Sequence, residues 1–202
     1  MRALSTCLIL FMAAAATFAD KKSDSKFSPG PASSYPNKQT NDNVTIAAVA
    51  YDTEELAHTA FGKLDPNQYG VLPVLVIIQN DTDTPLKLNV LEAEYNPATG
   101  RHVEATPAAD VQTLGGPEKI PSISGPRTSI PLPHKSHKNP LGVMEIEGRS
   151  FAAKLIPAHD SANGFFYFQT EHHPGATIYL TGIKLAGTGK DVMFFEIPLD
   201  KK

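Results

Sequence analysis

Histidine is the residue type in this chain that is best suited to bind a metal ion, because imidazole and carboxylate donors suit Zn²⁺ and Cu²⁺. Two clusters supply such donors, His134-Lys135-Ser136-His137 and Glu171-His172-His173. The candidate ligands are therefore His134, His137, His172 and His173. Lysines beside the first pair would repel a cation, and Pro174-Gly175 marks a turn after the second. Solvated loop histidines are the simpler interpretation, so no metal cofactor is predicted, and a histidine-based metal-binding protein stays an alternative.

A second group of possible ligands is the acidic and hydroxyl segment Asn80–Thr84. Counted as a calcium loop from Asp81, it places Asp83 at the third position and Glu92 at the twelfth. The fifth and sixth positions, 85–86, are proline and leucine, where such a loop needs an oxygen ligand and a glycine. Asn, Asp and Thr side chains readily bond their own backbone in turns. The segment is therefore predicted to be a turn at the end of a strand.

Residue types of hydrolases also occur, but their spacing does not favour catalysis. His159-Asp160-Ser161 brings three triad residue types together, yet neighbours on a turn diverge and cannot form the relay that activates a serine. Glu145 and Glu147 are expected on one face of a strand, whereas a glycosidase needs carboxylates facing each other across a sugar. No Gly-x-Ser-x-Gly sequence occurs. No catalytic residue is predicted, and a hydrolase with a dispersed site stays an alternative.

The first nineteen residues have the features of a secretory signal peptide. Arg2 precedes an apolar stretch from about residue 3 to 18, and Thr17-Phe18-Ala19 resembles a cleavage context. Cys7 is the one cysteine of the chain and would leave with residues 1–19. The mature chain is therefore expected to be exported to the periplasm or the extracellular space, without disulfides or stable membrane insertion.

The charge of the chain is nearly balanced, and the composition of the part after residue 19 indicates a spacer followed by one domain. There are 18 Lys and Arg against 21 Asp and Glu, so the basic excess of a nucleic-acid-binding protein is missing. Residues 20–42 are rich in Ser, Pro, Lys and Asn and are predicted to be a disordered spacer. Residues 43–200 are predicted to form one domain, interrupted at 107–142 by an insert that contains seven prolines.

Within this domain, short apolar segments alternate with Gly, Pro and Asn, as in antiparallel β-proteins. The predicted strands are 43–52, 70–79, 85–95, 101–105, 150–156, 165–170, 176–186 and 191–199. Residues 70–105 are expected to form an antiparallel meander. One short helix is predicted at 53–61, because Asp52 or Thr53 can cap its start and Gly62 can end it.

Three stretches resemble uncharacterised exported bacterial immunoglobulin-like domains. They are "VLVIIQNDTDTPLKL", "EYNPATGRHVEA" and the pattern from Pro157 to Gly164-Phe165-Phe166-Tyr167-Phe168. The likeness covers about 43–199 without the insert, and Ala158 stands where that pattern prefers glycine. The resemblance implies an all-β, antiparallel immunoglobulin-like β-sandwich in the cell envelope, and it implies no catalytic residues.

The strongest signal is burial. Residues 71–78, 165–168 and 192–197 are apolar on both faces, whereas a half-buried strand alternates. Such strands need cover on the second face, because so large an exposed apolar patch is rare in monomers. The cover could be internal, from the 53–61 helix or from apolar residues of the insert, or it could be a partner protein. The insert residues concerned are Ile120, Ile123, Ile130, Leu132 and Leu141.

Together these features predict an exported, non-catalytic binding or structural module of the cell envelope. It would act through an apolar sheet face or through the Pro-rich insert, and its possible partner is an envelope protein.

Overall fold

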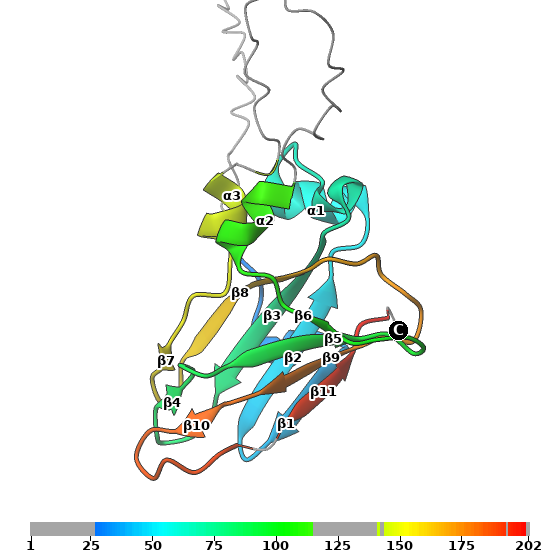
Figure 1. Ribbon diagram of the computed structural model, residues 1–202. Helices are drawn as coiled ribbons and strands as arrows, with labels where there is room; N and C mark the ends of the chain where they lie inside the picture. Colours follow the sequence, from blue (N-terminus) through cyan, green and yellow to red (C-terminus); the bar gives the residue numbers. More distant parts are fainter. Residues whose placement is uncertain (1–26, 115–140, 142–143, 193, 201–202) are drawn as a thin grey trace, which may run out of the picture.

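The computed structural model describes residues 27–114, 141, 144–192 and 194–200 and is mostly β-structure in antiparallel sheets (Figure 1). The β3 sheet has the order β1 (Lys38–Asn41), β2 (Val44–Ala50), β3 (Leu72–Asn80) and β8 (Ser161–Phe168). The β5 sheet has the order β11 (Phe195–Pro198), β9 (Thr177–Thr181), β5 (Glu92–Asn96) and β6 (Val103–Glu104). A small sheet joins β10 (Lys184–Leu185), β4 (Leu86–Lys87) and β7 (Leu155–Ile156).

The β3 sheet and the β5 sheet share one apolar core. Alternate residues of each strand point into it, because successive side chains on a strand face opposite ways. Its fully buried members include Ile46, Val74, Val76, Ile78, Tyr95, Ile178, Leu180, Phe195 and Ile197. The two sheets are therefore two layers with the main core between them.

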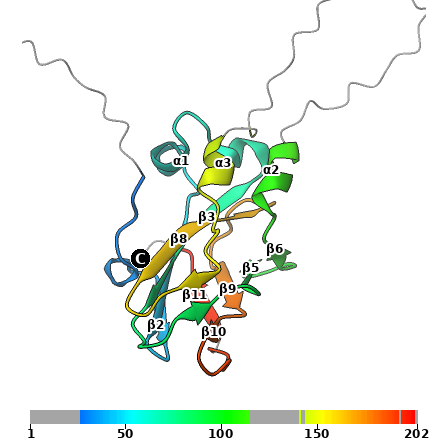
Figure 2. The ribbon, with the colours of Figure 1, turned by 90° about the vertical axis from the view of Figure 1, so that its left-hand side faces the viewer.

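A second core lies on the other face of the β3 sheet. There Leu75, Ile77, Phe165 and Tyr167 are at most 1% exposed. They pack with Ala32, Ala57, Ala60, Phe61, Val111, Leu141 and Ile146. Figures 1 and 2 show the three α-helices that carry several of these residues gathered at one end of β3 and β8. The prediction of strands buried on both faces is confirmed for β3 and β8, and the cover comes from the chain itself.

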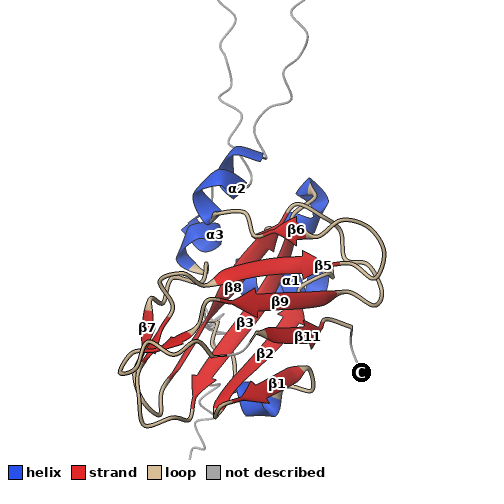
Figure 3. Cartoon of the chain, turned by 60° about the horizontal axis from the view of Figure 1, so that its bottom comes forward, coloured by secondary structure: helices blue, strands red, loops and turns tan. Residues whose placement is uncertain are grey.

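For the third segment, 192–197, that prediction is wrong. β11 buries Phe195 and Ile197 but exposes Glu196 and Pro198, and Phe194 is 45% exposed. β11 is the edge strand of the β5 sheet, and no described helix lies over the outer face of this sheet (Figure 3). In the segment 192–197, successive apolar residues therefore do not indicate a strand that is buried on both faces.

The helix predicted at 53–61 is confirmed as α1 (Glu54–Phe61). The Thr53 hydroxyl accepts a hydrogen bond from the Leu56 amide at 3.4 Å, and Gly62 ends the helix with a positive φ of 68°. The prediction of a single helix is wrong, however. The described residues also form α2 (Ala108–Leu114), α3 (Met144–Gly148) and the 3₁₀ turns η1 (Ala32–Ser34) and η2 (Pro66–Tyr69).

The predicted meander over 70–105 is wrong, because β3, β4 and β5 lie in three different sheets and do not pair with one another. β3 pairs with β2 and β8, β4 with β7 and β10, and β5 with β6 and β9. After Asn80 the chain leaves the β3 sheet and continues in the β5 sheet at Glu92. Within 70–105, only β5 and β6 form a local hairpin.

Residues 27–42 differ from the predicted disordered spacer. Ala32 is fully buried, and β1 pairs with β2 from Lys38↔Ala47 to Asn41↔Val44. Side chains of β1 also reach the neighbouring layer: Gln39 Oε1 accepts from the Glu196 amide at 2.8 Å, and Asn41 Nδ2 donates to the Phe194 carbonyl at 3.0 Å. A polar composition thus does not prevent order where an existing sheet edge supplies hydrogen-bond partners. The predicted signal peptide, residues 1–19, lies outside the described residues.

Candidate binding cleft

A cleft of about 530 Å³ opens beside β8, between the β3 sheet and the β5 sheet. Its walls come from β5 and β6, from the start of α2, from the segment before β7 and from β8. The lining residues are Leu91–Glu94, Glu104–Ala108, Ser150, Phe151 and 165–167. This volume is in the range of ordinary ligand sites.

One wall of the cleft is a pair of stacked aromatic rings. The rings of Phe151 and Phe166 lie 5.3 Å apart with an interplanar angle of 16°, and both side chains are half-buried. The segment 149–151 lies directly on β8: the Phe165 amide donates to the Arg149 carbonyl at 2.8 Å, and the Phe151 amide donates to the Phe165 carbonyl at 3.0 Å. This approach requires Gly164, because a Cβ there would lie 2.5 Å from the Phe151 Cα.

The opposite wall is formed by β5 and β6 and includes Glu92, Glu94 and Glu104, whose side chains lie on the outer face of the β5 sheet. Glu94 on β5 lies directly across from Glu104 on β6. In the part of the chain that the structure describes, none of the three forms an ion pair. The apolar aromatic surface of the cleft therefore lies next to a sheet face that carries negative charge without an ion pair among the described residues.

Tyr167 borders the cleft but is not available for acid–base chemistry. Its hydroxyl donates to the Ile146 carbonyl at 2.6 Å, and burial raises the pKa of this phenol well above its ordinary value. The glutamates project side by side from one sheet face and do not face each other across a substrate, as glycosidase carboxylates do. The described lining contains no histidine, lysine or cysteine.

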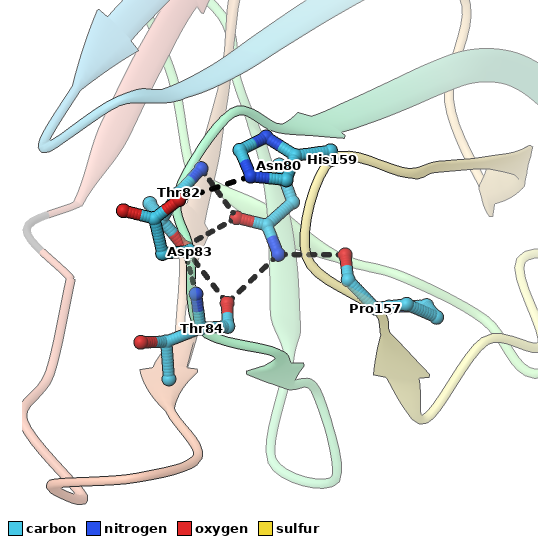
Figure 4. Close-up of polar contacts among 6 residues, drawn as sticks. All are labelled: Asn80, Thr82, Asp83, Thr84, Pro157 and His159. Carbon is cyan, nitrogen blue, oxygen red and sulfur yellow. Dashed lines mark hydrogen bonds and ion pairs between the residues drawn. The ribbon is translucent and has the colours of Figure 1, made fainter.

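The segment Asn80–Thr84 is a turn, as predicted, and Figure 4 shows why it is so well fixed. The buried Asn80 amide group donates to the carbonyls of Thr84 at 2.9 Å and Pro157 at 2.8 Å. Its oxygen accepts from the Thr82 amide at 3.1 Å and lies 2.7 Å from the Thr82 hydroxyl. The side-chain groups of Asn80 are thus used to join the strand end to the segment before β8.

The other candidate residues are dispersed. His172 pairs with Asp200 at 3.2 Å, whereas the His173 backbone amide donates to the Tyr95 hydroxyl at 2.7 Å. Within the described ranges, no three His, Cys, Asp or Glu side chains are grouped as metal ligands. His134, His137 and insert residues 115–140, which include Ile120, Ile123, Ile130 and Leu132, lie outside the described residues. Leu141 is fully buried in the second core.

The hydrolase-like residues do not form a site. The His159 Nε2 lies 3.0 Å from Asp83 Oδ1, an interaction that is drawn in Figure 4. The Asp160 side chain instead accepts from the Ser161 amide at 2.7 Å. Glu145 and Glu147 lie in α3 and not on a strand, which corrects the prediction for them. The strand pattern was wrong there because the apolar residue between them, Ile146, is the inward residue of a short helix turn.

The cleft itself was missed by reasoning from the sequence. The alternation Glu92-Ala93-Glu94 was visible and indicates an exposed strand face, but its position opposite Glu104 depends on the register of the hairpin. The contact of β5 and β6 with β8 depends on pairing between segments that are more than fifty residues apart in the sequence.

A scan against protein-family models and a search of curated proteins found no match to this chain. Among the helices that the structure describes, none is long and apolar enough to span a membrane.

Proposed function

We propose that this chain is an exported, non-catalytic binding module of the cell envelope, with an immunoglobulin-like arrangement of its two layers, and that the cleft beside β8 is its binding site. Two four-stranded antiparallel sheets around one core support the immunoglobulin-like arrangement. The features of residues 1–19 support export, which predicts a mature chain that begins near Asp20 by intact mass.

The observation that carries the proposal is the half-buried Phe151–Phe166 stack, open to a cleft of about 530 Å³. Aromatic surface of this kind gains free energy when a ligand removes it from water. The apolar sheet face considered from the sequence is a weaker candidate, because α1, α2, α3 and the segment 27–35 already cover it.

The test blocks the cleft and leaves the fold intact. Peptides are selected from a random twelve-residue library on the wild-type protein, and their binding is mapped by amide shifts in NMR spectra. Ala108 lines the cleft at the start of α2, whereas the next residue, Ala109, is exposed and does not line it. The substitution Ala108→Trp should abolish binding of the selected peptides, and the matched control Ala109→Trp should leave it unchanged.

Two results would contradict the proposal. One is the recovery of no peptide whose shifts centre on Leu91–Glu94, Thr106 and Phe151. The other is equal peptide binding by the Ala108→Trp variant, with both variants unfolding at the same urea concentration as the wild type.

A further inference from the structure

We infer that the partner is a positively charged protein segment that lies across the outer face of the β5 sheet and places an arginine or lysine side chain in the cleft. The inference rests on the proposed function, because it names the partner of that same site.

The first support is a row of side chains that crosses all four strands of the β5 sheet. Glu196 on β11 lies opposite Tyr179 on β9, Tyr179 lies opposite Glu94 on β5, and Glu94 lies opposite Glu104 on β6. This acid row, Glu196–Tyr179–Glu94–Glu104, points outward, because the alternate residues Phe195, Leu180, Ala93 and Tyr95 are buried. Glu92 shares its face two residues before Glu94.

The second support is that the acid row forms no ion pair with the residues that the structure describes. Like charges directly opposite each other on neighbouring strands destabilise a sheet, and Glu94 and Glu104 are such a pair. The ion pairs of the described residues join other side chains, such as Lys184 with Asp191 and Lys190 with Asp42. A basic partner would place positive charge beside Glu94 and Glu104, and its attraction to both carboxylates would offset the repulsion between them.

The third support is aromatic surface on the same face. The rings of Tyr179 and Phe194 lie 5.3 Å apart, and Phe194 is 45% exposed. Figure 3 shows this face toward the viewer, and no helix lies in front of β5, β9 and β11. Exposed rings among carboxylates can pack against the aliphatic stems and bind the charged ends of arginine and lysine side chains.

The acid row and the cleft are continuous, because Glu94 and Glu104 belong to both. A basic segment on the outer face of the β5 sheet would therefore pair with these carboxylates at the border of the cleft, and a cationic side chain that reaches from it into the cleft would meet the Phe151–Phe166 stack. A guanidinium group suits both, since it pairs with carboxylates and stacks on aromatic faces. This juxtaposition distinguishes the site from a merely acidic surface.

The test uses a fluorescent eight-residue peptide of alternating arginine and serine, and the same peptide with each arginine replaced by neutral, nearly isosteric citrulline. Binding to the full mature chain is measured by anisotropy at low and physiological salt. The arginine peptide should bind at least about tenfold more tightly than the citrulline peptide, and its affinity should fall as salt rises.

Paired variants locate the effect. The double substitution Glu94→Gln and Glu104→Gln should weaken arginine-peptide binding at least about fivefold and raise the urea midpoint of unfolding, because it removes the opposed charges. The control is Glu54→Gln with Glu55→Gln, which removes the same net charge from the first turn of α1. The control should change the affinity by less than about twofold.

Equal binding of the arginine and citrulline peptides, or an equal effect of the two double variants, would overturn the inference. If library peptides without basic residues then still bind in the cleft and are lost with Ala108→Trp, the proposed function stands and only the partner class is wrong. If nothing binds in the cleft, the proposed function itself fails.

Discussion

At the scale of single residues, Asn80 shows that a segment of possible metal ligands can have a purely structural role. Its amide group donates to the backbone carbonyls of Thr84, Pro157 and, at a longer distance, Ile156, and its oxygen accepts from Thr82, while the side chain is fully buried. A buried polar side chain is stable only when its hydrogen bonds are made, and here the turn itself supplies the partners.

Asn80 is therefore expected to be important for stability. The substitution Asn80→Ala should lower the free energy of unfolding by about 2–3 kcal/mol, because it removes the donor to the Pro157 carbonyl, one of the donors to the Thr84 carbonyl and the acceptor of the Thr82 amide. Urea unfolding followed by circular dichroism measures the change. Asp81→Ala serves as the control, since Asp81 is exposed and should change stability by less than about 0.5 kcal/mol. Equal effects of the two substitutions would contradict the structural role.

Tyr167 gives a prediction for the pH dependence of stability. Burial raises the pKa of its phenol in the folded chain, whereas the unfolded phenol loses its proton near the ordinary value of about 10. Above that pH the folded state binds more protons than the unfolded state, so the free energy of unfolding should fall, by up to about 1.4 kcal/mol per pH unit. Below the unfolded pKa the contribution is fully present.

The measurement is urea unfolding of the wild type and of Tyr167→Phe from pH 8 to pH 11. The wild type should lose more stability than the variant at the alkaline end, because the variant lacks this phenol. Parallel curves for the two proteins would show that Tyr167 titrates alike in both states.

At the scale of elements, strand existence could be predicted well, and strand pairing could not. The continuous apolar run at Leu72–Asn80 and the aromatic run ending at Phe168 indicated buried strands, and both are central to the fold. The strands β6 and β7 were predicted too long, and the predicted strands 85–95 and 176–186 are each divided in two, into β4 and β5 and into β9 and β10, which lie in different sheets. Their ends depend on where the chain crosses between layers, and single-sequence periodicity does not contain that information.

The same limit explains what was missed at the candidate site. The outward direction of Glu92 and Glu94 follows from alternation with Ala93 and is visible in the sequence. That Glu104 and Tyr179 join them depends on the β5–β6 and β5–β9 registers, the second of which spans more than eighty residues. The helices α2 and α3 were missed because they are short and lie near prolines. Each has a single buried apolar residue, Val111 or Ile146, and one residue is too few to show a helical period.

Close packing of the 149–151 segment on β8 predicts a strong effect at one glycine. The substitution Gly164→Ala should lower the free energy of unfolding by about 2 kcal/mol or more, because the added methyl would collide with the Phe151 backbone and force the two segments apart. Gly148→Ala is the matched control, since a Cβ there meets nothing within 4 Å. The control should be neutral or stabilising by up to about 1 kcal/mol, and a similar loss in both variants would argue against this packing.

At the scale of the whole molecule, the β3 sheet is a middle layer between the β5 sheet and a cover of helices and N-terminal segment. The helices and the N-terminal segment cover the outer face of the β3 sheet. The outer face of the β5 sheet is therefore the open sheet face of the described residues, and for this reason we propose that the partner binds there. The position of the binding face thus depends on the double burial of β3.

Two adjacent isoleucines on β3 test this double burial most directly. Ile78 points into the core between the two sheets, and Ile77 points into the core under the helices; each is at most 1% exposed. Urea unfolding of Ile77→Ala and of Ile78→Ala compares the two faces with the same chemical change. Both substitutions should lower the free energy of unfolding by about 2–5 kcal/mol. A change below about 0.5 kcal/mol for Ile77→Ala, beside a large loss for Ile78→Ala, would mean that the outer face of the β3 sheet is exposed to water and would contradict the account.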